Sequence, residues 1–354
     1  MRALYFESHG KVSGLVVGER PKPRPGEGEV LVSLRAASLN HLDLFVLRGM
    51  PAIPVELPHI GGADGAGTVA ELGEGVTGWR IGDEVVLNPG LWCGRCEFCE
   101  RGEESQCVKF GLVGEHVNGT FAEYVKVPAS SLAPKPTRLS WTEAAAFGLT
   151  FLTAWRMLMT RARLEAGESV LVHGIGGGVA LAALLIAKRV GATVFVTSAS
   201  DAKLARARVL GADHTLNYTS CDVGREVRNL TDKRGVDVVV ESVGAATWNA
   251  SLRSASKGGR IVTCGATTGP NPSEEVRLIF WNQLSILGST MGSRGDWRAM
   301  AGALDEWQVR PVVDSVLPLE RGREAYERMA SGGQFGKIVL DVSGVDSPTG
   351  QKGA

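Results

Sequence analysis

The fold is decided by residues 169–180, with the sequence SVLVHGIGGGVA. Its first five residues form a short apolar run, which predicts a buried parallel strand. The glycines follow at once, and the alanine-rich residues 181–190 then predict a helix that stops at Gly191. Residues 193–198 predict a second strand. The order is therefore strand, glycine loop, helix and strand.

A glycine loop in this context predicts a dinucleotide site. Glycine lets backbone N–H groups approach a pyrophosphate, and the amino end of the helix adds partial positive charge. The alternative is a tight structural turn without a ligand, and the last small position of the motif is Ala180 instead of glycine. The candidate ligand-binding residues are Gly174, Gly176, Gly177, Gly178 and Val179.

The chain length and the net charge limit the classes of protein to which this chain can belong. A chain of 354 residues suggests two domains. Lys plus Arg and Asp plus Glu number 38 each, so nothing directs the protein to nucleic acid or to an anionic membrane. The longest apolar run, residues 179–187, is too short to span a bilayer, and the first residues lack the apolar core of a signal peptide. We expect a soluble, cytoplasmic protein.

Two kinds of strand pattern divide the chain. Residues 1–150 are rich in short strands and turns, which predicts a partly open β-barrel. From residue 169 strands alternate with helices and reach six strands, which predicts a doubly wound parallel sheet. We therefore expect a first domain over 1–150, a nucleotide-binding domain over 151–290, a return to the first domain over 291–342, and a disordered tail over 343–354. The six strands are predicted at residues 169–173, 193–198, 214–218, 236–241, 259–264 and 284–288.

Four of the six cysteines lie within fifteen residues, in the pattern C-x2-C-x2-C-x7-C. Four thiolates close a tetrahedral shell on Zn²⁺ with no open position, so we expect a structural ion in a lobe over residues 89–111. The alternative is a set of free cysteines. Nearby glutamates would repel phosphate, which argues against a nucleic-acid zinc ribbon. The predicted ligands are Cys93, Cys96, Cys99 and Cys107.

Several short motifs carry a family resemblance. They are GEVLV at residues 28–32, AASLN at 36–40, GDEV at 82–85 and GTFAEY at 119–124. In this order they resemble the medium-chain dehydrogenase/reductase family, which includes zinc-type alcohol dehydrogenases and quinone reductases. The resemblance implies a GroES-like catalytic domain joined to a Rossmann domain, a small-molecule substrate, and assembly as a homodimer or homotetramer.

The chain departs from the family at the catalytic zinc. The resemblance places the three zinc ligands at Asn40, Ala63 and Leu149, and alanine and leucine cannot bind a metal. We therefore expect no catalytic zinc. The alternative is a rebuilt site of different geometry, drawn from residues nearby in the sequence: His41, Asp43, His59 and Asp64.

Without zinc, oxidation of a plain alcohol loses electrostatic help, whereas hydride addition to an alkene conjugated with a carbonyl needs only hydrogen-bond donors for the enolate. Asn40 matches an asparagine of the zinc-independent reductases, and we expect Asn40 and Asp43 to line the pocket. His41 is either a proton relay or a phosphate-contacting or packed residue, and Asp64 is expected to order the pocket. Phe45 stands where a reductase tyrosine often lies, which weakens a quinone-specific function.

The end of the second strand addresses the choice of cofactor. An NAD site usually carries an acid there, but this strand ends in Ser198, followed by alanine and serine. Asp201 is expected to cap the next helix instead. Space for a 2′-phosphate favours NADP(H) over NAD(H), with Lys203 and Tyr218 as its contacts, unless Lys203 is a solvated helix charge and Tyr218 a packing residue.

The resemblance also implies how the nicotinamide is held. The threonine at position 153 approaches the ring, and turns that end neighbouring strands hold the ring and its amide. The residues assigned to this end of the cofactor are Thr153, Val243, Gly265, Ala266, Thr267, Ser289 and Thr290.

Three functions are consistent with this sequence. The first is a nicotinamide-dependent oxidoreductase that acts on a carbonyl or a conjugated alkene, with structural zinc only. The second is an alcohol dehydrogenase proper with an atypical metal site. The third is a non-catalytic dinucleotide-binding protein.

Overall fold

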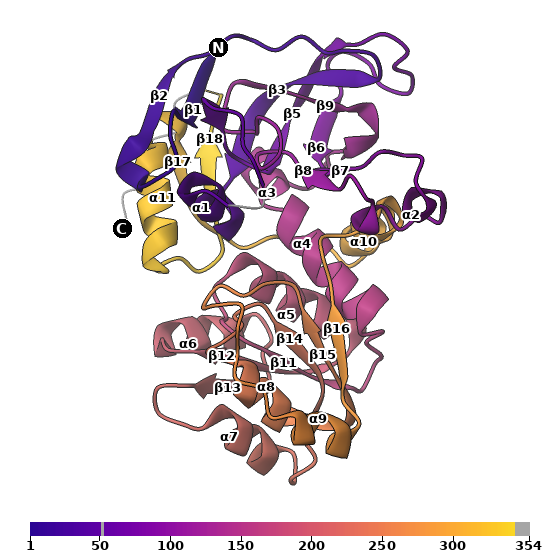
Figure 1. The fold of residues 1–354 in the computed structure, drawn as a ribbon, viewed down its shortest axis with the longest axis vertical. Helices are drawn as coiled ribbons and strands as arrows, with labels where there is room; N and C mark the ends of the chain where they lie inside the picture. Colours follow the sequence, from indigo (N-terminus) through magenta and orange to yellow (C-terminus); the bar gives the residue numbers. More distant parts are fainter. Residues whose placement is uncertain (51–52, 344–354) are drawn as a thin grey trace.

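The alternation of strands and helices from residue 169 produces the predicted six-stranded parallel sheet, in the order β13-β12-β11-β14-β15-β16. The structure is a computed structural model that describes residues 1–50 and 53–343. This sheet forms the lower half of the molecule in Figure 1. Its strands are β11 (Ser169–Val172), β12 (Thr193–Ser198), β13 (His214–Asn217), β14 (Val236–Glu241), β15 (Ala255–Thr263) and β16 (Ser285–Gly288).

Helices cover both faces of this sheet because successive strand residues point to opposite sides. Val170 and Val172 pack with the helix that follows the glycine loop, whereas Leu171 belongs to the core on the other face. The doubly wound fold is therefore confirmed. Its helices are α5 (Gly178–Val190), α6 (Asp201–Val209), α7 (Val223–Leu230), α8 (Trp248–Ser254) and α9 (Val276–Asn282).

The upper half in Figure 1 contains the barrel-like sheet predicted for the first domain, for which the resemblance implies a GroES-like fold. Seven strands form its main sheet in the order β10-β6-β5-β3-β18-β17, with β9 paired to β3, and a smaller sheet has the order β2-β1-β4. The closing strand β18 pairs with β3, so the end of the chain completes the first domain. The strands are β1 (Arg2–Phe6), β2 (Leu15–Glu19), β3 (Glu29–Ser38), β4 (His59–Ile60), β5 (Asp64–Leu72), β6 (Glu84–Leu87), β9 (Tyr124–Pro128), β10 (Leu132–Pro134), β17 (Val313–Pro318) and β18 (Lys337–Asp341).

The remaining elements complete the two domains and the connections between them. Residues 141–161 form two short helices, α3 and α4, and a π-helical turn, and α10 packs on α4. The two short strands β7 and β8 pair and close the cysteine lobe. These elements are β7 (Gly90–Leu91), β8 (Gly111–Leu112), η1 (Val12–Gly14), η2 (Glu104–Gln106), η3 (Ala129–Ser131), η4 (Arg156–Arg161), η5 (Leu319–Arg321), α1 (His41–Arg48), α2 (Glu97–Glu100), α3 (Trp141–Ala145), α4 (Gly148–Trp155), α10 (Arg294–Glu306) and α11 (Gly322–Ser331).

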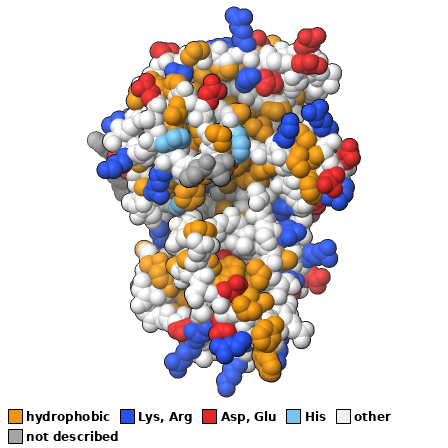
Figure 2. Space-filling view, viewed as in Figure 1, with side chains coloured by type: hydrophobic (Ala, Val, Ile, Leu, Met, Phe, Trp, Pro, Cys, Tyr) orange, Lys and Arg blue, Asp and Glu red, His pale blue; other side chains and the backbone are white. Residues whose placement is uncertain are grey.

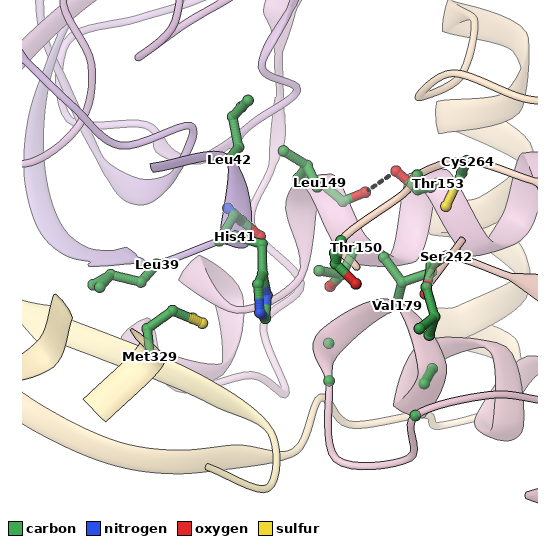
Figure 3. A pocket seen from close by; sticks show the side chains of 18 of the residues that line it. Leu39, His41, Leu42, Leu149, Thr150, Thr153, Val179, Ser242, Cys264 and Met329 are labelled. Carbon is green, nitrogen blue, oxygen red and sulfur yellow. Dashed lines mark hydrogen bonds between the residues drawn. The ribbon is translucent and has the colours of Figure 1, made fainter. Parts of the chain in front are cut away.

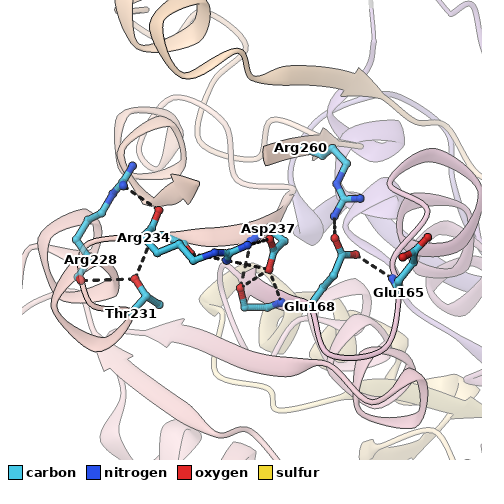
Figure 4. A network of polar contacts seen from close by, with 9 residues as sticks. Glu165, Glu168, Arg228, Thr231, Arg234, Asp237 and Arg260 are labelled. Atoms are coloured by element: carbon cyan, nitrogen blue, oxygen red, sulfur yellow. Dashed lines mark hydrogen bonds and ion pairs between the residues drawn. The ribbon is translucent and has the colours of Figure 1, made fainter. Parts of the chain in front are cut away.

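The two edges of the parallel sheet differ. At the amino edge, polar side chains tie neighbouring strands together: Asp237 accepts from the Ser169 backbone N–H at 2.9 Å and pairs with Arg234, and Arg260 pairs with Glu168 (Figure 4). At the carboxyl edge the strands end in glycine-rich turns. The amino edge is therefore closed by ion pairs, and the carboxyl edge is left for a ligand.

The surface carries no extended patch of one charge on the face in Figure 2, where acidic and basic side chains intermingle. No helix within the described ranges has the length and apolar character needed to cross a membrane. The tail that we predicted to be disordered, residues 343–354, lies outside the described residues except for Ser343.

Candidate active site

A cavity of about 830 Å³ lies between the two domains, at the carboxyl edge of the parallel sheet. His41 and Met329 line it from the GroES-like domain, and Val179 and Ser242 line it from the Rossmann domain (Figure 3). An elongated cofactor and a substrate could therefore be held together between the domains.

The glycine loop is built for close approach. Gly176 has a φ of 117°, which L side chains rarely adopt. A Cβ on Gly178, the first residue of α5, would lie 2.7 Å from Thr150 Cγ2. The N-cap of α5, Gly177, has no side chain to bond the first amides of the helix. These amides are suited to a pyrophosphate, so the loop fits the predicted dinucleotide.

Nearly all predicted cofactor residues line this one cavity. Ser289 is the exception, since it is not among the residues that line the cavity, and its backbone N–H donates to Thr263 O at 2.9 Å. The lining residues are Thr153, Gly174, Gly176, Gly177, Gly178, Val179, Ser198, Lys203, Tyr218, Val243, Gly265, Ala266, Thr267 and Thr290.

As expected, β12 ends in a serine and not in an acid, but the residue that caps the following helix differs from the prediction. Ser200, not Asp201, caps α6, because its hydroxyl accepts from the Lys203 backbone N–H at 3.3 Å. Asp201 is the first helical residue and accepts instead from Asn217 Nδ2 at 2.7 Å. Lys203 Nζ donates to Gly332 O at 2.7 Å, which ties α6 to the GroES-like domain beside Gly176.

Where the resemblance places the catalytic zinc, the structure shows three buried polar side chains, which we call the lysine cluster: Asn40, Asp64 and Lys337. Lys337 Nζ lies 2.9 Å from Asp64 Oδ2 and 2.5 Å from Asn40 Oδ1. Asn40 Nδ2 donates to Asp64 Oδ2 at 3.0 Å. Asp64 Oδ1 accepts from the Leu149 backbone N–H at 2.6 Å, at the amino end of α4. Both Asp64 oxygens are therefore engaged, and the charge opposite them is an ammonium.

The two predicted aspartates do not line the cavity. Asp64 lies behind Asn40 and orders the wall, while Asp43 belongs to the cap of α1. The Asp43 carboxylate accepts from the backbone N–H groups of Asn40 at 2.6 Å and Gly62 at 3.0 Å. Burial raises the pKa of Asp43 to about 7. The expectation that Asp43 lines the pocket is therefore corrected, because the carboxylate is turned toward backbone.

In the described residues the candidate histidines do not belong to a group arranged to hold a metal ion. His41 lines the cavity, and desolvation by the surrounding atoms together with the positive charges of Lys337 and Arg48 lowers its pKa. The His59 ring is buried and its Nε2 lies 3.1 Å from Gly114 O, away from the cavity. Within the described parts of the chain, the four cysteines are the single group of three or more His, Cys, Asp or Glu arranged to hold an ion.

The sequence reading missed part of the cavity wall. Lys337 was not among the predicted site residues, although a lysine directly before the apolar residues 338–340 is an available signal for a buried cation. Glu115 and His116 follow the cysteine lobe and also line the cavity, with 3.1 Å between Glu115 Oε2 and His116 Nδ1. Nothing in their local sequence indicates that position.

The four predicted zinc ligands converge, and we call them the sulfur cluster. All four Sγ atoms lie within 4.8 Å of one another. The pairs Cys96–Cys99 and Cys93–Cys107 are separated by 3.6 and 3.5 Å. A tetrahedral Zn²⁺ with bonds of about 2.3 Å needs sulfurs roughly 3.8 Å apart, so the cluster fits the ion.

The cysteine lobe is joined to the rest of the molecule by buried charge. Arg156, which directly follows α4 and is 3% exposed, donates to Glu103 and Asp296, each at 2.6 Å. Glu104, also buried, accepts from Arg294 Nε at 2.6 Å. The lobe therefore contacts the helix whose amino end binds Asp64.

Comparison with known proteins agrees with this geometry. The family model described as an alcohol dehydrogenase GroES-like domain matches residues 26–137, and the one described as a zinc-binding dehydrogenase matches residues 178–306. A zinc-type alcohol dehydrogenase-like protein of Schizosaccharomyces pombe is 34% identical over 96% of this chain and 99% of that protein. An acryloyl-coenzyme A reductase of Metallosphaera sedula is 33% identical, with coverage of 96% and 99%.

A solved structure titled as an NAD-dependent alcohol dehydrogenase is 46% identical, with a TM-score of 0.93, and the match covers 97% of this chain and 100% of that one. The chain therefore belongs to the medium-chain dehydrogenase/reductase family and is an oxidoreductase of the zinc-type alcohol dehydrogenase group.

Proposed function

We propose that this chain is a nicotinamide-dependent reductase of alkenes conjugated to a carbonyl, with a structural zinc and no catalytic metal. The observation that carries the proposal is the lysine cluster. Of the three positions at which the resemblance expects zinc ligands, Ala63 and Leu149 cannot bind a metal, and Asn40 is bonded to Lys337 and Asp64. Both carboxylate oxygens of Asp64 already accept hydrogen bonds, from the Leu149 backbone N–H and from Asn40 and Lys337.

The cavity wall is suited to such a substrate. Leu39, Leu42, Phe45 and Leu149 give it an apolar surface beside the polar Asn40 and Lys337. The bound cofactor would supply a hydride, and polar side chains of the wall, among them Asn40, would stabilise the charge that develops on the substrate. The relative named as an acryloyl-coenzyme A reductase supports this reaction class.

We further propose that NADP(H) is preferred over NAD(H), because Ser198 ends β12 without a neighbouring acid and Lys203 lines the cavity beside it. Lys203 would exchange its bond to Gly332 O for one to the 2′-phosphate. Lys203→Ala should raise the Kd of NADPH about tenfold and leave that of NADH within twofold, in line with the loss of one charge-assisted hydrogen bond. Equal effects on both cofactors, measured by fluorescence titration, would contradict this preference.

The central test is a steady-state assay with cyclohexenone and with cyclohexanol, using NADPH, NADH and their oxidised forms, beside a zinc count on the same enzyme. We expect enone reduction, one zinc per chain, and activity that survives brief treatment with a chelator. Two zinc ions per chain with chelator-sensitive alcohol oxidation would overturn the proposal and establish an alcohol dehydrogenase proper, which the names of several relatives favour.

The proposal also covers the cellular location and the oligomeric state of the enzyme. We propose that the chain works in the cytoplasm as a homodimer or homotetramer, as the family resemblance implies. Tight NADPH binding without turnover of any enone, quinone, aldehyde or alcohol would instead favour the non-catalytic function.

A further inference from the structure

We propose that Glu241 is a positioning residue of the cofactor site, and that His173 extends its effect to the glycine loop. Glu241 does not itself line the cavity. Its buried carboxylate holds the turn after β14 in the shape that fits the dinucleotide. The inference rests on the proposed function only for the nicotinamide cofactor, and it applies to any substrate that the enzyme reduces.

The first observation is that Glu241, the last residue of β14, is fully buried and surrounded by hydrogen-bond donors. Its Oε1 accepts from the backbone N–H groups of Val243 at 2.7 Å and Gly244 at 3.0 Å. The hydroxyls of Thr247 and Ser251 donate to Oε2 at 2.7 and 2.6 Å. A buried carboxylate is costly unless such bonds satisfy it. The turn and α8 are therefore held in one arrangement around this side chain.

The second observation is that the turn held by Glu241 forms part of the cavity wall. Val243 lines the cavity, and its carbonyl accepts from the Thr268 backbone N–H at 2.8 Å and from the Thr268 hydroxyl at 2.7 Å. Gly244 has a φ of 87°, and a Cβ there would lie 2.9 Å from Ala266 Cα. Ala266 belongs to the turn after β15 and also lines the cavity. One carboxylate thus fixes two neighbouring turns of the cofactor site.

The third observation is a chain of hydrogen bonds from Glu241 to the glycine loop. Burial lowers the pKa of His173, so its ring is neutral and carries one N–H. Because Ser251 gives its proton to Glu241, its oxygen accepts from His173 Nε2, 3.1 Å away. His173 Nδ1 then accepts from the Thr197 hydroxyl at 3.3 Å, and the oxygen of that hydroxyl accepts from the Gly174 backbone N–H at 3.2 Å. The chain therefore joins the glycine loop to the turn after β14.

This network lies at the carboxyl ends of β12, β11 and β14, which are neighbours in the parallel sheet. A dinucleotide bound by a doubly wound sheet lies across these strand ends. Turns that buried bonds fix in advance lose less entropy when the ligand binds. Loss of Glu241 should therefore weaken the binding of NADPH and NADH equally, because Lys203, the predicted contact of the 2′-phosphate, makes its bonds elsewhere.

The test compares Glu241→Ala and Glu241→Gln with the control Asp237→Asn. Asp237 lies on the same strand and also accepts a backbone N–H, but at the amino edge and outside the cavity lining. Glu241→Ala leaves the N–H groups of the turn without an acceptor and should raise the Kd of NADPH and of NADH about tenfold, measured by fluorescence titration. Glu241→Gln keeps an oxygen for both N–H groups, so its Kd values should stay within about threefold of wild type. Asp237→Asn should bind both cofactors like wild type, even if its thermal midpoint falls.

Steady-state kinetics gives a second readout. In Glu241→Ala the KM for NADPH should rise about tenfold while kcat at saturating NADPH stays within about threefold of wild type, because the lost interaction serves binding. An unchanged Kd in Glu241→Ala, equally weak binding in Glu241→Gln, or the same loss in Asp237→Asn would overturn the inference. If wild type binds NADPH but reduces no enone, the proposed function fails, and the Kd values still decide the role of Glu241.

A second variant covers the case in which Glu241→Ala does not fold. His173→Phe keeps a ring in the buried space but cuts the chain between Ser251 and Thr197. Its Kd for NADPH should rise about fivefold, in line with the loss of a buried hydrogen bond. The control is His59→Phe, since His59 is also a buried histidine but lies outside the cavity lining, and it should bind NADPH like wild type. Equal Kd values for the two variants would overturn the inference.

Discussion

The sulfur cluster and the lysine cluster solve the same electrostatic problem in different ways. Each gathers electron-rich side chains around a positive charge. In the sulfur cluster the four ligands lie between Cys93 and Cys107, and an ion would complete them. In the lysine cluster the charge belongs to Lys337, which is 273 residues from Asp64 and 297 from Asn40. The four cysteines of one short segment would take their positive charge from a bound metal ion. The lysine cluster, whose residues are far apart in the sequence, contains its positive charge in the Lys337 side chain.

The difference shows what each cluster needs in order to form. Four cysteines need only a short loop that brings them within a few ångströms, and the β7–β8 pair closes that loop. The lysine cluster needs β18 to pair with β3 and α4 to point its amino end at Asp64. The first is expected to depend on metal, and the second on the completed fold.

The largest expected effect is on the sulfur cluster. Cys96→Ser removes one thiolate ligand, and structural zinc contributes on the order of 10 kcal/mol of binding free energy in small domains. We expect the zinc content, measured by mass spectrometry, to fall from one ion per chain to nearly none, with a lower thermal midpoint. Cys221→Ser, outside the cluster, should keep the ion. Full zinc content in Cys96→Ser would show that the ion is held elsewhere.

The second-largest expected effect tests whether buried ion pairs anchor the cysteine lobe to the end of α4. Arg156→Met leaves Asp296 buried without its cation and frees Glu103 of the cysteine lobe. Breaking a buried ion pair costs about 3–5 kcal/mol, which urea unfolding measures. The control Arg310→Met breaks an exposed pair with Glu143 and should cost less than about 1 kcal/mol. Equal costs would show that the lobe is not anchored by its buried charge.

The smallest expected effect is a pH dependence of the free energy of unfolding that comes from Asp43 and not from Asp64. Asp64 faces an ammonium, whereas the Asp43 carboxylate is bonded to backbone N–H groups and its burial raises its pKa to about 7. Between the ordinary value of 3.8 and 7 the folded protein holds a proton that the unfolded chain has released. The free energy of unfolding should therefore decrease as the pH rises through this window, by at most about 1.4 kcal/mol per pH unit.

The comparison for this prediction is Asp43→Asn, which does not titrate. Urea unfolding of both proteins at pH 5, 6, 7 and 8 should show wild type losing stability relative to Asp43→Asn up to pH 7 and running parallel above it. Parallel behaviour over the whole range would mean that Asp43 stays ionised in the folded protein.

Periodic and local features of the fold were predictable. The strand–loop–helix order at residues 169–190 and the six-stranded sheet are confirmed, because apolar spacing and glycine position report backbone conformation directly. Helix ends were less accurate: Ser200 and not Asp201 caps α6, since both residue types cap well and only the backbone path separates them. The α1 helix was not anticipated, although Asn40 and Asp43 form a capping box at its start.

The same distinction between local and long-range features applies to the site residues. The glycine loop and the group of four cysteines were predictable because each is a single short segment. Asp43 was misplaced because its side chain turns toward the Gly62 amide, a contact made only in the folded chain. Lys337 was missed because its partners lie in the first domain, hundreds of residues earlier.

The sequence by itself determined the family, the parallel sheet, the glycine loop, the spacing of four sulfurs, and the presence of Ala63 and Leu149 at two positions where the resemblance expects zinc ligands. These depend on residue type and short-range spacing, which the chain carries before it folds. Only the tertiary structure decided what stands at the second zinc position, because pairing β18 with β3 brings an ammonium from the far end of the chain to Asp64. A buried charge must find its counter-charge on folding, and that choice depends on distances the linear sequence does not contain.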